Sequence, residues 1–128
     1  MAARLDEILS KGRRPIWDWG DPGEWRSREW NRQADFLVNR AMDEKASQHW
    51  TDATLFSLAR TAHVLVFCDG GLRRSTQDSA AGWAAYVQIG GNFKLFAYEA
   101  EALTNVQSAF SAEVIALDMA LKFLKDLF

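Results

Sequence analysis

The stretch His63–Ser75, HVLVFCDGGLRRS, decides the fold of this chain. Its apolar run from Val64 to Cys68 is nearly continuous, which is typical of a central strand that is buried on both faces of a sheet. The run stops at Asp69, and two glycines follow it. An aspartate at the end of a buried strand either caps a turn or lies at the mouth of the sheet as a metal ligand.

The composition describes one small globular domain, or part of one. The chain has 128 residues, of which 48% are hydrophobic and 25% are charged. Its net charge of −2 does not favour a general polyanion binder, which usually has a basic excess. The single cysteine excludes an internal disulfide, no apolar run is long enough to span a membrane, and the N-terminal residues lack the apolar core of a signal peptide. We therefore expect an intracellular protein with no membrane partner.

The residues after Ser75 predict an antiparallel hairpin. Residues 80–89, AAGWAAYVQI, have the composition of a second strand, and Gly82 within it indicates a bulge or a close backbone approach. Gly90-Gly91 is a two-residue hairpin signal, and residues 92–103, NFKLFAYEAEAL, form the third strand. Alternation places Phe93, Leu95 and Ala97 on one face of this strand, and Lys94, Phe96 and Tyr98 on the other.

Helices are predicted on both sides of these strands. Residues 108–128, SAFSAEVIALDMALKFLKDLF, repeat apolar residues at three- and four-residue spacing. The same spacing predicts a helix that starts near Asn31, and Asp52–Arg60 is a second, short helix before the first strand. The apolar stripe of the Asn31 helix consists of Ala34, Leu37, Val38, Ala41 and Met42.

Three carboxylates stand out by their position. Asp69 ends the first strand, Glu113 lies in the first turns of the last helix, and Asp35 lies in the first turn of the Asn31 helix, each beside small residues. Carboxylates that converge at the end of a sheet suit Mg²⁺, a hard cation, and two such ions can clamp an in-line phosphoryl displacement. The alternative for Glu113 and Asp35 is that each is an ordinary first-turn acid stabilised by the helix dipole.

The order of these motifs resembles the first half of a type 1 ribonuclease H domain, in the version found in retroelement reverse transcriptases and plant-type ribonuclease H-like proteins. The similar segments lie within His63–Leu124 and are FCDGG, SAAGWAAYV, the Gly-Gly hairpin and SAFSAEVIALDMAL. The resemblance implies a ribonuclease H-like α/β fold, incomplete in this chain, with a three-stranded antiparallel sheet portion and flanking helices. It also implies that Asp69 and Glu113 are catalytic ligands of Mg²⁺ or Mn²⁺.

A second segment, Arg28–Asp43, is similar to the terminal motif of the same family, an Arg-Glu-x-Asn-x-x-Ala-Asp stretch that opens the last helix. The resemblance implies that Asp35 is a third catalytic metal ligand. Two features depart from the family. The motif precedes the first strand here, and the family's further strand with a fourth carboxylate does not follow the last helix before Phe128.

Three explanations remain open: a fragment across a junction of two such units or of a longer permuted one, a small permuted domain, or an accidental match at Asp35. The expected parts are an N-terminal arm and Trp-rich loop (residues 1–30), a segment resembling the family's last helix (31–60), and the first half of a ribonuclease H-like domain (61–128). Without the further strand, Val64–Phe67 is an exposed apolar edge, which natural proteins avoid or cover. We therefore expect a homodimer or a partner strand at this edge.

By resemblance, the chain binds nucleic acid and hydrolyses the RNA strand of RNA–DNA hybrids. The alternative is a non-catalytic remnant that binds nucleic acid or another subunit. Arginine suits phosphate contacts, although solvated surface charge is the simpler interpretation of an exposed arginine. The expected nucleic-acid contacts are Gly70, Gly71, Arg73, Arg74, Asn31 and Arg28.

Overall fold

The computed structural model describes the backbone of residues 25–128 and the side chains from residue 31 onward. The expected N-terminal helix or arm and most of the Trp-rich loop therefore lie outside the described residues. The elements in chain order are α2 (Trp25–Glu44), β1 (Gln48–Thr51), α3 (Ala53–Ala59), β2 (Val64–Arg73), β3 (Asp78–Ile89), β4 (Asn92–Leu103) and α4 (Ala109–Leu127).

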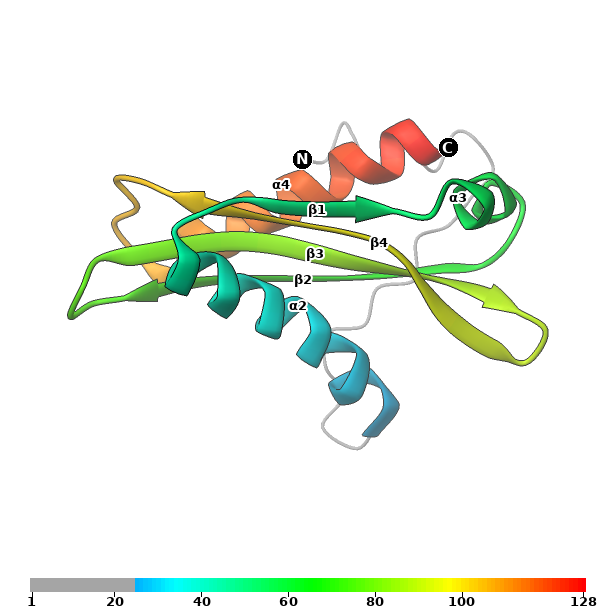
Figure 1. Cartoon of the computed structure of the whole chain (residues 1–128), viewed down its shortest axis with the longest axis horizontal. Coiled ribbons are helices and arrows are strands. Elements are labelled where there is room, and N and C mark those ends of the chain that lie inside the picture. Colours follow the sequence, from blue (N-terminus) through cyan, green and yellow to red (C-terminus); the bar gives the residue numbers. More distant parts are fainter. Residues whose placement is uncertain (1–24) are drawn as a thin grey trace.

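These elements form a mixed α/β fold around one open antiparallel sheet (Figure 1). The sheet has four strands in the order β1-β4-β3-β2, so the expected three-stranded portion is wrong by one strand. The additional strand is β1, which pairs with β4 and was not predicted from the sequence. It has only four residues, three of them exposed, so it carries no alternating apolar pattern by which it could be found.

The helices α2 and α4 cover opposite faces of the sheet (Figure 1). All five residues of the predicted stripe of α2 are buried, which confirms the helical periodicity of this segment. The helix begins at Trp25 rather than near Asn31, because residues 25–30 contain no glycine or proline that would stop it. The α4 face holds a second cluster, in which Trp83 stacks on Phe123 with ring centroids 4.0 Å apart.

The first predicted strand differs from its prediction in two ways. It runs on to Arg73 instead of ending at Asp69, because Gly70 and Gly71 pair with two alanines of β3. Among the described strands β2 pairs only with β3, so it is an edge strand and not a central one. Its apolar run reflects two faces covered by helices, which does not require a neighbouring strand on each side.

The Gly82 prediction is confirmed in its second form, the close backbone approach. A Cβ atom at Gly82 would lie 2.7 Å from the carbonyl oxygen of Glu99. The bulge lies farther along, where Tyr86 pairs with Leu95 and Ala85 with Ala97, which leaves Phe96 between them. Phe96 and Ala97 consequently both join the cluster on the α4 face, and the alternation predicted for this strand does not extend across the bulge.

The remaining turns and caps follow the sequence signals. Gly90 has a φ of 62°, which the tight turn between β3 and β4 requires. The carboxylate of Asp52 accepts a hydrogen bond from the N–H of Leu55 and caps α3. Ser108 caps α4 by accepting from the N–H of Ser111. This cap fixes the first turn of α4, which directly precedes Glu113.

Candidate functional site

Asp69 lies in the second half of β2, where the strand passes between the two helices. Alternation along the strand places Asp69 on the same face as Gly71. That face meets α2, since a Cβ atom at Gly71 would lie 3.2 Å from Cε of Met42 and 3.6 Å from Cγ1 of Val38. Asp69 is therefore a half-buried carboxyl group at the β2–α2 interface rather than the cap of a turn.

The carboxyl group of Asp35 on α2 meets that of Asp69. The pKa of Asp69 is raised to about 6, chiefly by burial and then by the hydrogen bond with the Asp35 side chain and the negative charge of Asp35. The N–H of Gly70 donates to Asp69 and opposes this shift. Two carboxylates in contact repel each other when both are ionised, so the contact favours the protonated form of Asp69. The structure thus brings together two of the three predicted metal ligands.

Glu113 reaches the site from the other side of β2. A Cβ atom at Gly70 would lie 2.3 Å from the carbonyl carbon of Ala112 and 2.5 Å from the backbone nitrogen of Glu113. Only glycine allows the backbone of α4 to approach the strand so closely. The negative charge of Glu113 is near enough to contribute to the raised pKa values of Asp69 and Cys68.

The side chain of Glu113 is exposed. Within residues 31–128, no three side chains of histidine, cysteine, aspartate or glutamate are arranged to hold one metal ion. Asp69 and Asp35 form a contact pair, and Glu113 borders that pair without completing a set of three ligands.

Cys68 precedes Asp69 and faces the α4 side of the sheet. The pKa of its thiol is raised to about 11, chiefly by burial and then by the negative charges of Asp69 and Glu113. A thiol with this pKa is almost fully protonated at neutral pH, so Cys68 serves as a small apolar side chain and not as a nucleophile.

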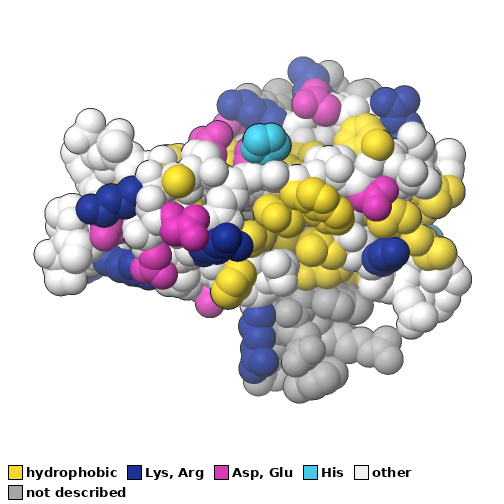
Figure 2. Space-filling model, viewed as in Figure 1, with side chains coloured by type: hydrophobic (Ala, Val, Ile, Leu, Met, Phe, Trp, Pro, Cys, Tyr) yellow, Lys and Arg dark blue, Asp and Glu magenta, His cyan; other side chains and the backbone are white. Residues whose placement is uncertain are grey.

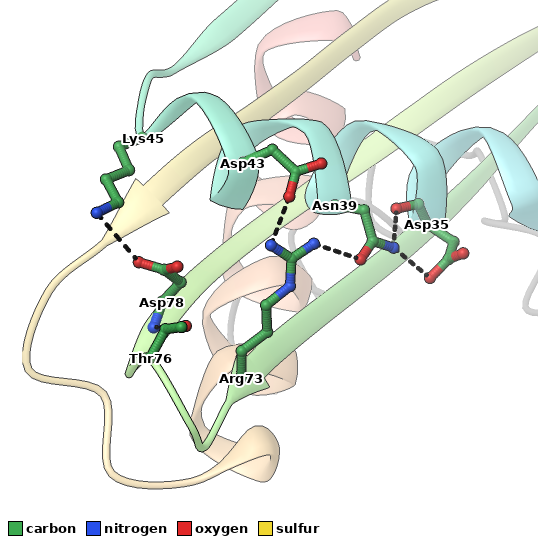
Figure 3. A network of polar contacts seen from close by, with 7 residues as sticks. All are labelled: Asp35, Asn39, Asp43, Lys45, Arg73, Thr76 and Asp78. Atoms are coloured by element: carbon green, nitrogen blue, oxygen red, sulfur yellow. Dashed lines mark hydrogen bonds and ion pairs between the residues drawn. The ribbon is translucent and has the colours of Figure 1, made fainter.

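A polar network extends from Asp35 along α2 to the end of β2 (Figure 3). The guanidinium of Arg73 donates to Asp43 through Nη1 and to Oδ1 of Asn39 through Nη2, the latter at 3.2 Å. Nδ2 of Asn39 donates to Oδ1 of Asp35 at 3.3 Å and to the backbone oxygen of Asp35 at 2.9 Å. Arg73, expected at a phosphate, is occupied by these contacts.

Sequence reasoning did not assign site roles to Asn39 and Asp43. The available signal was their spacing, because residues 35, 39 and 43 recur every four positions and share one side of a helix. These three residues lie beside the apolar stripe of the helix. From the sequence alone, such polar residues cannot be distinguished from ordinary solvated surface residues.

The other expected nucleic-acid contacts differ in accessibility. Arg74 is exposed in the turn after β2, and Asn31 is exposed on α2. Gly70 and Gly71 are in contact with α4 and α2 respectively. Arg28 lies in the first part of α2, where the backbone alone is described.

Charged side chains of both signs lie together at one end of the face shown in Figure 2, and hydrophobic side chains gather near its middle. This face therefore carries no broad basic surface, in agreement with the net charge of −2.

The chain matches no protein-family model, no curated protein and no solved structure. Neither α2 nor α4 nor the shorter α3, the helices of the described residues, is long and apolar enough to cross a membrane.

Proposed function

We propose that this chain is a ribonuclease H-like protein that binds nucleic acid and hydrolyses the RNA strand of RNA–DNA hybrids with the help of a divalent cation. The observation that carries the proposal is the contact between Asp69 and Asp35. These two residues come from separate motifs of the resemblance, and the fold places their carboxyl groups against each other. The antiparallel succession β2-β3-β4 followed by α4 also agrees with the order that the resemblance implies.

The acids of the site fit a hard divalent cation in their chemistry. Asp69, Asp35 and Glu113 offer only carboxylate oxygens, which Mg²⁺ and Mn²⁺ prefer. The repulsion between Asp69 and Asp35, which contributes to the raised pKa of Asp69, would be relieved by a positive ion. The Glu113 side chain is exposed, so a change of rotamer can bring its carboxylate toward Asp69 and Asp35.

In this proposal Asp69 and Asp35 hold the cation, and Glu113 completes the ligand set. When bound, Mg²⁺ or Mn²⁺ supplies an activated water and neutralises charge at the leaving oxygen. The N–H of Gly70 orients the carboxylate of Asp69, and Asn39 orients that of Asp35. Arg74 contacts the phosphate backbone, and the hybrid is recognised by its A-like shape and 2′-hydroxyl groups.

The experiment that tests this proposal is cleavage of a labelled RNA–DNA hybrid in Mg²⁺ and then in Mn²⁺. The matched variants are Asp69→Asn, at the site, and Asp126→Asn, an equal change at an exposed position near the end of α4. We expect cleavage that Asp69→Asn abolishes and Asp126→Asn retains. No cleavage by the folded chain in either metal would reject the enzymatic function.

A second candidate function is a non-catalytic binding module that forms a dimer through β2. Two observations favour it: only two of the acids are in contact, and the outer edge of β2 has no partner among the described strands. The ten residues of β2 are long enough for edge pairing with a second copy. Light scattering distinguishes the states, since a monomeric mass with slow amide exchange throughout β2 contradicts dimerisation.

A further inference from the structure

Two pairs of side chains connect β2 to α2, and the distance between the pairs is nearly the same along the strand as along the helix. We call these two contacts the cross-links of the interface. Asp69 and Arg73 lie four positions apart on one face of β2, a distance of about 13 Å along a strand. Asp35 and Asp43 lie eight positions apart on α2, a distance of about 12 Å along a helix. Asp35 therefore meets Asp69 at one end, and Asp43 meets Arg73 at the other.

Asn39 lies between these two cross-links and contacts both of them (Figure 3). An amide side chain has an accepting oxygen at one end and a donating nitrogen at the other. Because Arg73 donates to Oδ1 of Asn39, the amide is held with Nδ2 directed at Asp35. The reversed amide would place its oxygen against a carboxylate and its NH₂ group against a guanidinium, and both contacts are repulsive.

We infer that Arg73 and Asn39 are positioning residues, which hold the Asp35 carboxylate in the orientation that binds a cation together with Asp69. This inference rests on the proposed cation site. Arg73 acts through Asn39, and Asp43 holds the guanidinium in place for that task. The ion pair with Asp43 adds little to stability, because the side chains of Arg73 and Asp43 are 35% and 64% exposed.

The inference predicts that Arg73→Ala changes the cation affinity in the direction opposite to that expected from charge alone. Removal of a positive charge near a cation site should by itself strengthen cation binding. If Arg73 positions Asp35, Arg73→Ala should instead weaken it. Loss of an outer partner of a metal ligand typically lowers metal affinity about 10- to 100-fold. We expect a loss near the lower end of that range for both Arg73→Ala and Asn39→Ala.

The test is calorimetric titration of the full chain with MnCl₂, accompanied by a thermal unfolding curve for each variant. The matched control is Arg40→Ala, which removes the same charge from an exposed residue that is paired with Glu44. In the Asn39→Ala background, Arg73→Ala should cause no further loss, because its route to Asp35 is already broken. Unfolding temperatures should remain close to that of the wild type.

Each outcome has a defined meaning. If the wild type binds Mn²⁺ and Arg73→Ala binds as well as Arg40→Ala, the positioning role is rejected and the proposed function stands. If the wild type binds no Mn²⁺, the cation site itself is rejected. NMR of the Asn39 side-chain amide then still tests the orientation, since Arg73→Ala should accelerate its exchange with solvent, and an unchanged rate rejects the contact.

Discussion

The carboxyl groups of Asp69 and Asp35 hydrogen-bond to each other where β2 meets α2. The basic residue of β2, Arg73, is paired with Asp43 and does not neutralise this contact. The folded chain therefore holds two acids against each other, an arrangement that costs stability whenever the pH favours ionisation of both groups.

The substitution Asp69→Asn should stabilise the chain at neutral pH. Asp69 has its pKa raised from 3.8 to about 6 in the folded state, so the folded state binds the proton more tightly than the unfolded state. The proton therefore favours folding below pH 3.8, and this stability is lost as the pH rises through 6. After allowance for solvent screening, we expect a gain of about 1–2 kcal/mol at pH 7.

Urea unfolding at several pH values measures this gain. It should shrink steadily below pH 6 and vanish as the pH falls below 3.8, where wild-type Asp69 becomes protonated in both states. A gain that does not change with pH, or an equal gain for Asp126→Asn, would contradict the assignment to this acid pair.

Addition of MnCl₂ or MgCl₂ should raise the unfolding temperature of the wild type. A ligand that binds only the folded state at 100 times its dissociation constant stabilises by about 2.7 kcal/mol. The increase should be absent in Asp69→Asn and present in Asp126→Asn, as followed by differential scanning calorimetry. An equal increase in all three proteins would indicate nonspecific ion effects.

The glycines of β2 should differ sharply in their tolerance of alanine. In Gly70→Ala the new Cβ would lie 2.3 Å from the backbone of Ala112, so α4 must move, and we expect a loss of about 2–3 kcal/mol. In Gly71→Ala the nearest atom, 3.2 Å away, is the flexible end of Met42, so the loss should stay below about 1 kcal/mol.

Gly91→Ala serves as the control for this pair, because nothing lies within 4 Å of a Cβ atom there. Urea unfolding should rank the three variants in the order Gly91, Gly71, Gly70 by increasing loss of stability. Equal losses at Gly70 and Gly71 would show that the close contact with α4 does not limit position 70.

Cys68 should react slowly with thiol reagents in the folded chain. Its pKa is raised from 9.0 to about 11, which lowers the thiolate fraction at pH 8 by about 100-fold relative to an ordinary thiol. Absorbance measurements with a disulfide reagent should show fast reaction only after denaturation. Rapid reaction of the native chain would contradict the burial of this residue.

The sequence predicted the elements whose signals are local. Spacing located α4 and the buried stripe of α2, and Gly90-Gly91 located the hairpin. The features that depend on distant partners were missed: β1 is ordered by β4, and the bulge at Phe96 is set by the register with β3. The edge position of β2 was expected from the missing further strand, although its apolar run alone indicated a central strand, because burial by two helices gives the same run.

The candidate site shows the same division. The two motifs named Asp69 and Asp35 separately, and only the fold shows that their side chains meet. The interpretation of Asp69 as a strand-terminal residue was wrong, because small residues on β3 allow the strand to continue through both glycines. The contacts of Arg73 were not predictable. Nothing in the residues next to it indicates that it binds Asn39 and Asp43, which lie on a helix much earlier in the chain.

The position of α2 ahead of all the described strands has a consequence for synthesis of the chain. A ribosome releases α2 before the strands that cover its apolar side, β2 and β3. Until they emerge, Leu37, Val38 and Met42 have no sheet to pack against. The nascent chain thus exposes the apolar stripe of α2, which is a target for chaperones, and Asp35 and Asp69 can meet only after α2 has docked on the sheet.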